Sequence, residues 1–320
     1  VKITQREPRT YIFNLGQNFA GNVRLKVKGP AGHKLTLRYG EMLHPDGRLM
    51  TENLRKARAT DFYVCKGDPA GEVFEPKFTF HGFQYIELTG LTEALPLEKI
   101  RGRVLMSATP QTGSFECSHS GVNRLWQNTL WGQKGNFLSV PTDCPQRDER
   151  LGWMGDAQVF MRTATYNMDV AAFFTKWMTD ITDSQDVEGI FPDIAPRLHE
   201  GEGFTGLDGL GGAAGWADAG IICPYNIYKV YGDTRVLERH YESMKRFMEF
   251  RIKQSPDYLG VNTGNGWGDW LSLGSKTPIE FIDTVYFASS TKLMEEIVTA
   301  INKPADAKKY AKLSANIKAA

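Results

Sequence analysis

The stretch Asp143-Cys-Pro-Gln-Arg-Asp-Glu-Arg-Leu-Gly-Trp-Met-Gly-Asp156 fits neither a core strand nor an ordinary amphipathic helix. It holds four carboxylates, two arginines and a tryptophan, and Pro145, Gly152 and Gly155 interrupt regular structure. Acids that transfer protons, arginine donors for hydroxyl groups and a flat indole surface suit a polar ligand of the size of a sugar. The stretch therefore predicts an active-site loop.

The N-terminal side of the chain has the pattern of β structure. Residues 22–28 alternate strictly between polar and apolar side chains, a Gly-Pro turn follows, and residues 34–39 alternate again, which predicts a hairpin. Further short β-rich runs, separated by glycine and proline, lie at 61–65, 73–80, 83–89 and 101–106. We expect residues 1–110 to form an antiparallel β-sandwich domain.

The pattern changes to helical periodicity after Pro110. Apolar residues recur at helical spacing in seven stretches, at 118–137, 157–167, 169–183, 213–231, 234–254, 278–302 and 304–318. Asp233 and Pro278 are expected helix starts. Two long glycine-rich connections, 200–212 and 260–274, separate some of these helices, and connections of this length usually carry function. We expect residues 111–320 to form a helical domain.

All seven tryptophans lie in the helical part, between Trp126 and Trp270. Three of them fall inside helical patterns and are expected in the core. The other four, Trp153, Trp216, Trp267 and Trp270, stand beside glycine and aspartate in expected loops or near helix ends. An indole in such a place can form the flat wall of a sugar site.

Composition argues against several other classes of protein. The net charge of the 320-residue chain is +1 and its Lys and Arg residues are scattered along the sequence, so neither nucleic acid nor an anionic membrane is an expected partner. No apolar run reaches the roughly 18 residues of a membrane span. The four cysteines are widely spaced, without metal-site spacing, and are expected to be mostly free and structural. We expect no metal and no cofactor.

The stretch 143–156 closely resembles the signature of the inverting α-L-rhamnosidases, glycoside hydrolase family 78. The segments 215–219 (Gly-Trp-Ala-Asp-Ala) and 268–271 (Gly-Asp-Trp-Leu) are similar to further segments of that family's catalytic domain. The resemblance covers essentially the whole chain and implies a β-sandwich followed by an (α/α)6 barrel. It also implies that the substrate is a rhamnose-containing oligosaccharide or glycoside. Terminal α-L-rhamnose would be removed from plant polysaccharides or rhamnosylated glycosides by single displacement.

The same resemblance assigns the site residues. Glu149 would be the general acid that protonates the glycosidic oxygen. Acidic and arginine side chains would bind sugar hydroxyls, and tryptophans would form the walls of the pocket, although Asp218 and Asp269 have no individual role assigned. The residues expected to bind substrate are Asp143, Arg147, Trp153, Asp156, Trp216, Asp218, Asp269 and Trp270.

We expect the barrel to be truncated in this chain. A six-hairpin barrel has twelve helices, whereas the sequence predicts about seven, and a half barrel would expose a large apolar face. In the family the general base is a glutamate a few hundred residues after the acid, so it is expected beyond Ala320, with Asp218 and Asp269 as weaker alternatives within the chain. We therefore expect a segment of a longer polypeptide, which intact mass against 35.9 kDa would test.

Other functions stay open at this point. A different (α/α)6-barrel glycosidase or phosphorylase would share the fold and the acid–base chemistry, and a non-catalytic carbohydrate-binding protein would share the aromatic residues. The segment 201–206 spells GxGxxG, but no strand precedes it, so it predicts a loop. His199 lies near Asp193 and Glu200 without metal-site spacing. The sequence leaves oligomeric state and compartment open, with the periplasm or the extracellular space favoured over the cytoplasm.

Overall fold

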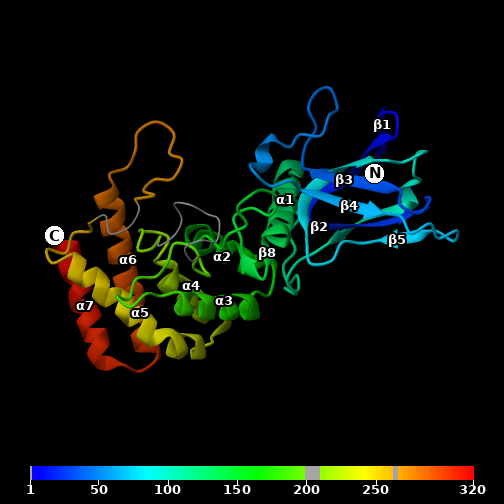
Figure 1. The fold of residues 1–320 in the computed structure, drawn as a ribbon. Helices are drawn as coiled ribbons and strands as arrows, with labels where there is room; N and C mark the ends of the chain where they lie inside the picture. Colours follow the sequence, from blue (N-terminus) through cyan, green and yellow to red (C-terminus); the bar gives the residue numbers. More distant parts are fainter. Residues whose placement is uncertain (1, 199–209, 262–265) are drawn as a thin grey trace. The chain divides into compact units, whose positions relative to one another are not determined.

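The structure, a computed structural model, describes residues 2–198, 210–261 and 266–320 and divides into two compact units (Figure 1). The first unit contains the chain up to Ala108 together with Phe115–Arg150, and the second contains Thr109–Ser114 and Leu151–Ala320. The stretch 143–156 is therefore divided between the two units. His199, Glu200 and the GxGxxG segment lie outside the described residues.

Seven antiparallel strands form the main sheet of the first unit, which confirms the expected antiparallel β domain. The sheet order is β1-β2-β6-β3-β4, and β5 and β7 also pair with β2. The strands are β1 (Lys2–Glu7), β2 (Thr10–Val27), β3 (Lys34–Gly40), β4 (Thr60–Val64), β5 (Glu72–Phe74), β6 (His81–Thr89) and β7 (Ile100–Val104).

The 18-residue strand β2 organises this sheet because it pairs with four other strands. The register of β2 against β6 shifts between Asn14 and Phe19. The first part of β2 also pairs with β1, and its last part pairs with β5 and β7. The last part buries alternate residues, as the sequence pattern predicts. The first part has consecutive buried residues, Tyr11–Phe13, so it lacks the alternation by which a strand is recognised, and the sequence analysis missed it.

The first unit also contains a helix and a small hairpin. Helix α1 (Ser120–Asn136) packs against β2, and β8 (Phe137–Leu138) pairs with β9 (Val140–Pro141) just before the 143–156 stretch. Two short 3-10 turns, η1 (Glu52–Leu54) and η2 (Leu97–Lys99), complete its regular structure in the described residues. Because α1 groups with the sheet, the compact units do not test the domain boundary expected near residue 110, which stays a prediction.

Six helices form the second unit as far as it is described, and with α1 they account for all seven helices that periodicity predicts. They are α2 (Met154–Asn167), α3 (Ala171–Asp183), α4 (Ala219–Tyr231), α5 (Arg235–Gln254), α6 (Ile279–Ala300) and α7 (Pro304–Ala319). Helix α4 begins six residues later than expected. Gly215 has a positive φ of 83° and its N–H donates to the Asp218 side chain (2.9 Å), which closes a turn where the helix was predicted.

The helices and cysteines bear out two of the simpler expectations. Among the described residues, none of the helices has the length and apolar character that a bilayer span requires. All four cysteines are free, and three of them, Cys65, Cys144 and Cys223, are buried.

Helices α5 and α6 are joined by a buried ion pair between Arg251 and Asp283. The Nη1–Oδ1 distance is 2.9 Å and the two side chains are 1% and 2% exposed. Arg251 Nη2 also donates to the carbonyl oxygen of Asp283 (3.2 Å). Burial raises the pKa of the Asp283 carboxyl, and the Arg251 guanidinium opposes that shift. Each charge is therefore tolerated in the core chiefly because the other is present.

We predict that Arg251→Met lowers the free energy of unfolding by about 3–5 kcal/mol, because it leaves the Asp283 carboxylate buried without its guanidinium partner. Urea denaturation measures this change. The double variant Arg251→Met with Asp283→Leu removes both charges and should recover most of the loss. A single variant as stable as the unchanged protein would show that the ion pair does not stabilise the helix packing.

Candidate active site

The loop that follows β9 is held by the first unit at several points. The N–H of Asp148 donates to the carbonyl oxygen of Leu54 (3.2 Å), which lies in η1. Arg150 Nη2 donates to the carbonyl oxygen of Phe80 (2.9 Å), and its guanidinium lies 4.3 Å from the centre of the Phe80 ring. Two segments of the β domain, remote in sequence, thus fix the loop that carries Glu149.

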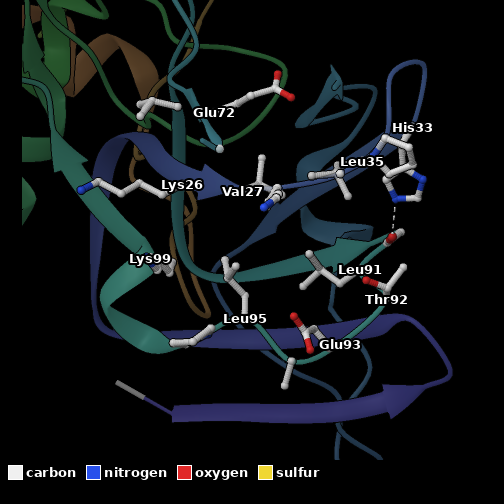
Figure 2. A pocket seen from close by; sticks show the side chains of 18 of the residues that line it. Lys26, Val27, His33, Leu35, Glu72, Leu91, Thr92, Glu93, Leu95 and Lys99 are labelled. Atoms are coloured by element: carbon white, nitrogen blue, oxygen red, sulfur yellow. Dashed lines mark hydrogen bonds between the residues drawn. The ribbon is translucent and has the colours of Figure 1, made fainter. Parts of the chain in front are cut away.

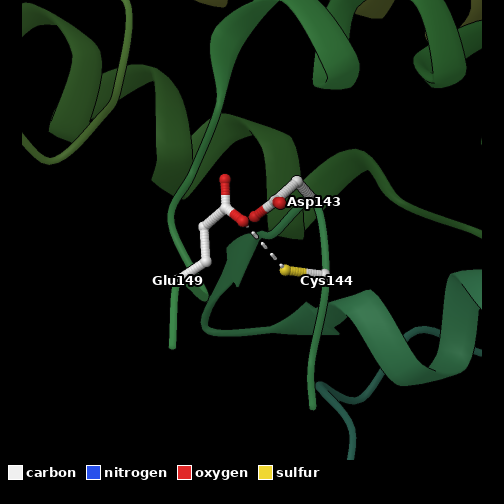
Figure 3. A group of neighbouring side chains, drawn as sticks. All are labelled: Asp143, Cys144 and Glu149. Carbon is white, nitrogen blue, oxygen red and sulfur yellow. Dashed lines mark hydrogen bonds between the residues drawn. The ribbon is translucent and has the colours of Figure 1, made fainter. Parts of the chain in front are cut away.

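The Glu149 carboxylate lies at the centre of a compact cluster, in which the side chains of Asp143, Cys144 and Glu149 converge (Figure 3). Glu149 Oε2 accepts a hydrogen bond from Arg147 Nε (2.9 Å) and forms an ion pair with Arg55 Nη1 (2.8 Å), and the Cys144 thiol lies 3.7 Å away. Arg147 also lies 3.7 Å from the Asp143 carboxylate. The Glu149 side chain is 13% exposed. Three residues expected at the site, Asp143, Arg147 and Glu149, are therefore together.

The same cluster could be taken for a metal site, since ligand atoms of Asp143, Cys144 and Glu149 all lie within 4.8 Å of one another. Two arginines already pair with Glu149 there. Burial, together with a hydrogen bond to Asp143, raises the pKa of the Cys144 thiol to about 12. We therefore read the cluster as a carboxylate–arginine site.

Arg55 is the member of this cluster that the sequence analysis missed. It follows η1 in the β domain, far from Glu149 along the chain, and has a positive φ of 56°. Its turn is fixed by Leu54, which is 1% exposed, and by a hydrogen bond from Asn53 Nδ2 to Glu41 Oε2 (3.1 Å). No sequence signal marks Arg55, because only the fold brings η1 to the loop.

Four tryptophans form a cluster in the second unit, with Trp267 in contact with the other three. The ring centres of Trp153, Trp216 and Trp270 lie 5.3, 6.0 and 5.4 Å from that of Trp267. Trp153 directly precedes α2, and Trp270 is 59% exposed. The structure thus brings together the four tryptophans that the sequence analysis separated from the core, although their contact with a sugar stays a prediction.

Asp193 holds this aromatic cluster in place. Its side chain is fully buried and accepts from Trp267 Nε1 (2.7 Å) and from the N–H of Ala213 (3.1 Å). Its carbonyl oxygen accepts from the N–H of Met154 (2.9 Å), the first residue of α2. Burial raises the pKa of the Asp193 carboxyl, and the Trp267 hydrogen bond opposes the shift. The sequence analysis noted Asp193 only as a neighbour of His199.

Asp218 has structural contacts on both carboxylate oxygens. It is 1% exposed, accepts from the N–H of Gly215 (2.9 Å) and from Ser290 Oγ (2.5 Å), and so ties the turn before α4 to α6. These contacts give it a supporting position. Its expected contact with substrate stays a prediction.

The other two candidate aspartates are exposed. Asp156 lies in the first turn of α2, where a negative charge interacts favourably with the helix dipole. Asp269 accepts from Thr277 Oγ1 (3.0 Å) beside the exposed Trp270. Both are accessible to a ligand, and neither position by itself assigns a role.

Two models of known protein families match this chain. Residues 110–320 match the model of the bacterial alpha-L-rhamnosidase 6 hairpin glycosidase domain, and residues 4–106 match that of the bacterial alpha-L-rhamnosidase concanavalin-like domain. The class is thus a helical glycosidase domain preceded by a β domain, and the seven helices correspond to part of such a barrel. The chain belongs to the bacterial alpha-L-rhamnosidase family.

Individual relatives agree with this assignment. An alpha-L-rhamnosidase of Streptomyces avermitilis is 44% identical over 319 residues, and the match covers 100% of this chain and 30% of the relative. An alpha-L-rhamnosidase of Formosa agariphila is 38% identical, and the match covers 93% of this chain and 32% of the relative. The crystal structure of the Streptomyces avermitilis enzyme complexed with L-rhamnose matches 98% of this chain and 29% of its own, with a TM-score of 0.92 and 43% identity. The alpha-L-rhamnosidase structure from Dictyoglumus thermophilum gives a TM-score of 0.92 at 38% identity, covering 100% and 35%. The chain thus spans about a third of the length of these relatives.

Gly155 in the first turn of α2 allows Trp216 to lie against the helix. A Cβ added at Gly155 would lie only 2.7–2.9 Å from atoms of the Trp216 indole. We predict that Gly155→Ala displaces Trp216 and destabilises the protein by about 1–3 kcal/mol, although alanine is the better helix former. Thermal unfolding and tryptophan fluorescence measure the two effects.

Gly132 in α1 provides the matched control, because a Cβ there has no atom within 4 Å. Gly132→Ala should stabilise the protein by about 0.5–1 kcal/mol through helix propensity alone. Equal stabilisation by both substitutions would contradict the contact between Gly155 and Trp216.

Proposed function

We propose that the intact protein removes terminal α-L-rhamnose from plant polysaccharides or rhamnosylated glycosides by inverting hydrolysis. The observation that carries this proposal is the position of Glu149, a mostly buried carboxylate fixed by Arg55 and Arg147 beside Asp143. Family membership supports the sugar, since the Streptomyces avermitilis relative was crystallised with L-rhamnose. A periplasmic or extracellular location belongs to the same proposal, because polymeric substrates occur there.

Glu149 acts as the general acid in this proposal. Both arginines pair with the carboxyl group at Oε2 and so fix its direction, and this carboxyl group delivers the proton to the glycosidic oxygen. As the bond to the leaving group breaks, positive charge develops on the sugar ring, and the carboxylates of the site stabilise it. Arg55 is thus a positioning residue that the β domain contributes to the acid.

Inversion also requires a carboxylate that activates water on the opposite face of the sugar, about 6.5–9.5 Å from the acid. Asp218 is unsuited to this step because it is buried and both of its oxygens accept hydrogen bonds. Asp269 is exposed, which gives it none of the shielding from water that a catalytic base usually has. We assign the base to neither residue.

The sugar itself is bound by hydrogen bonds and aromatic faces. Asp143, Arg147 and Asp156 are proposed to bind its hydroxyl groups, because carboxylates and guanidinium groups match hydroxyl donors and acceptors. Trp153, Trp216 and Trp270 are proposed to pack against its C–H faces. Trp267 supports these three indoles from the centre of their cluster. Asp218 and Asp269 hold the segments around these indoles.

We predict that Glu149→Gln in the intact protein lowers turnover of natural rhamnosides by about 10²–10⁴-fold, the usual contribution of a general acid. The loss should be smaller for an activated aryl rhamnoside, whose leaving group needs little protonation. Steady-state kinetics on both substrates measure the difference, and L-rhamnose binding should be retained. The exposed Glu188→Gln provides a control of equal charge change. Normal rates on natural glycosides would show that Glu149 is not the acid.

We predict that Trp153→Ala weakens L-rhamnose binding by about 1–2 kcal/mol, through loss of an aromatic contact. Tryptophan fluorescence during titration with L-rhamnose measures it, with D-glucose, D-galactose and L-fucose as control sugars. Trp131→Phe in α1 controls for the loss of one indole signal. Unchanged affinity would show that Trp153 has a structural role only, and an equal response to all four sugars would contradict rhamnose selectivity.

A further inference from the structure

A second polar site lies in the first unit, at the end of β2. Two hollows, with volumes of about 670 and 250 Å³, share Lys26 and Lys99 among their lining residues. Neither hollow includes a residue of the Glu149 cluster. The smaller hollow, which we call the basic groove, is lined by Arg24, Lys26, Glu98, Lys99, Arg101 and Arg103.

The pairing of β2 with β7 creates the basic groove. Arg24 lies directly opposite Arg101 in the antiparallel register, and their neighbours Leu25 and Ile100 are buried in the core. Because side chains alternate between the two faces of a strand, both arginines are directed to the outer face. Lys26 follows two residues after Arg24, and Arg103 follows two residues after Arg101, on the same face.

Few carboxylates balance these charges. Glu75 pairs with Arg24 (3.3 Å) and with Arg103 (3.7 Å). Lys26, Lys99 and Arg101 form no ion pair with any residue that the structure describes. Five cations thus face two carboxylates, Glu75 and Glu98, in the basic groove itself. The larger hollow adds Glu93 and Glu72, and Glu72 already accepts hydrogen bonds from Tyr63 and from backbone N–H groups.

This arrangement corrects the sequence analysis, which treated the basic residues as scattered. Residues 24–26 and 99–103 are far apart in the sequence, and their charges meet only because β2 pairs with β7. Like charges directly opposite each other destabilise a sheet. Glu75 offsets part of this repulsion through its ion pair with Arg24, and an anionic ligand would offset the charge of Arg101.

The larger hollow adds an apolar surface to the groove. Its apolar lining includes Val27, Leu35, Leu91 and Leu95, which lie close together in Figure 2, and three of these residues are almost fully buried. Lys26 and Lys99 belong to both hollows. A ligand lying across both hollows would meet the cations of the basic groove on one side, and the apolar surface together with the Glu72 and Glu93 side chains on the other.

We propose that the basic groove binds an anionic polysaccharide through the carboxylates of its hexuronate units. Outward residues repeat about every 7 Å along a strand and adjacent strands are about 4.8 Å apart, so the cations form a ladder that suits a polymer with repeated charges. Guanidinium groups bind carboxylates through paired hydrogen bonds. The C–H faces and methyl groups of adjacent sugars pack on the apolar surface of the larger hollow. The choice of a saccharide over another polyanion rests on the proposed glycosidase function.

The test measures retention of the intact protein by sodium polygalacturonate in affinity electrophoresis, with methyl-esterified polygalacturonate as the uncharged form of the same polymer. We expect retention by the first polymer and none by the second. The double variant Lys99→Ala with Arg101→Ala should weaken retention about tenfold, as expected for the loss of two exposed ion pairs. Lys308→Ala with Lys312→Ala, on the exposed face of α7, removes the same charge elsewhere and should have no effect.

Several outcomes would overturn the proposal. Equal retention by the esterified polymer would exclude recognition of carboxylates. If both double variants lost retention equally, the binding would depend only on the net charge of the protein. Single-stranded DNA that competes as well as polygalacturonate would identify a general polyanion surface. The groove variant should keep or raise the melting temperature, because it removes the repulsion between Arg24 and Arg101. A lowered melting temperature together with lost retention would point to a structural role.

The test separates this proposal from the proposed hydrolysis. A small neutral aryl rhamnoside reports only on the Glu149 site, so the groove variant should hydrolyse it at the unchanged rate. Loss of polygalacturonate retention with intact rhamnoside hydrolysis supports the groove. If the protein is retained by polygalacturonate but releases no rhamnose, the proposed binding by the groove is supported and the proposed glycosidase function is rejected.

Discussion

The buried Asp193 carboxylate needs hydrogen-bond donors. The residues that bond to Asp193 come from several separate segments of the helical unit, which therefore meet at this residue. Trp267 and Ala213 donate to its side chain, Met154 donates to its carbonyl oxygen, and its own N–H donates to Leu210. An unsatisfied buried carboxylate would be very costly, so these segments cannot separate independently. The start of α2 and the four tryptophans are positioned by this one constraint. The candidate sugar walls thus depend on a residue that is itself hidden from any ligand.

The loop that carries Glu149 depends on the β domain in a comparable way. Gly82 in β6 approaches the loop so closely that a Cβ there would lie 2.6 Å from the Cβ of Gln146. A backbone hydrogen bond from Asp148 of the loop to Leu54 in η1 and an ion pair from Arg55 act on the same loop. The β domain therefore does more than precede the helical domain. It builds the surroundings in which Glu149 is held, which gives a physical reason for the two domains to occur in one chain.

The two sites of the molecule rest on different forces. The tryptophan cluster offers area and shape, so the proposed binding of a neutral sugar there should change little with salt. The basic groove offers charge, and its attraction falls off over a screening length of about 8–10 Å at ordinary ionic strength.

The sequence by itself determined the strands that alternate, all seven helices and the family, because burial periodicity and a long polar motif are local properties of the chain. It also indicated which tryptophans lie outside the core. It missed the first half of β2, where consecutive buried residues hide the alternation, and it missed Arg55, the position of Asp193 and the basic groove. Each of these three depends on a contact between residues distant in sequence. Only the tertiary structure decides such contacts, because strand pairing and the burial of charge are satisfied by the whole fold and leave no local pattern.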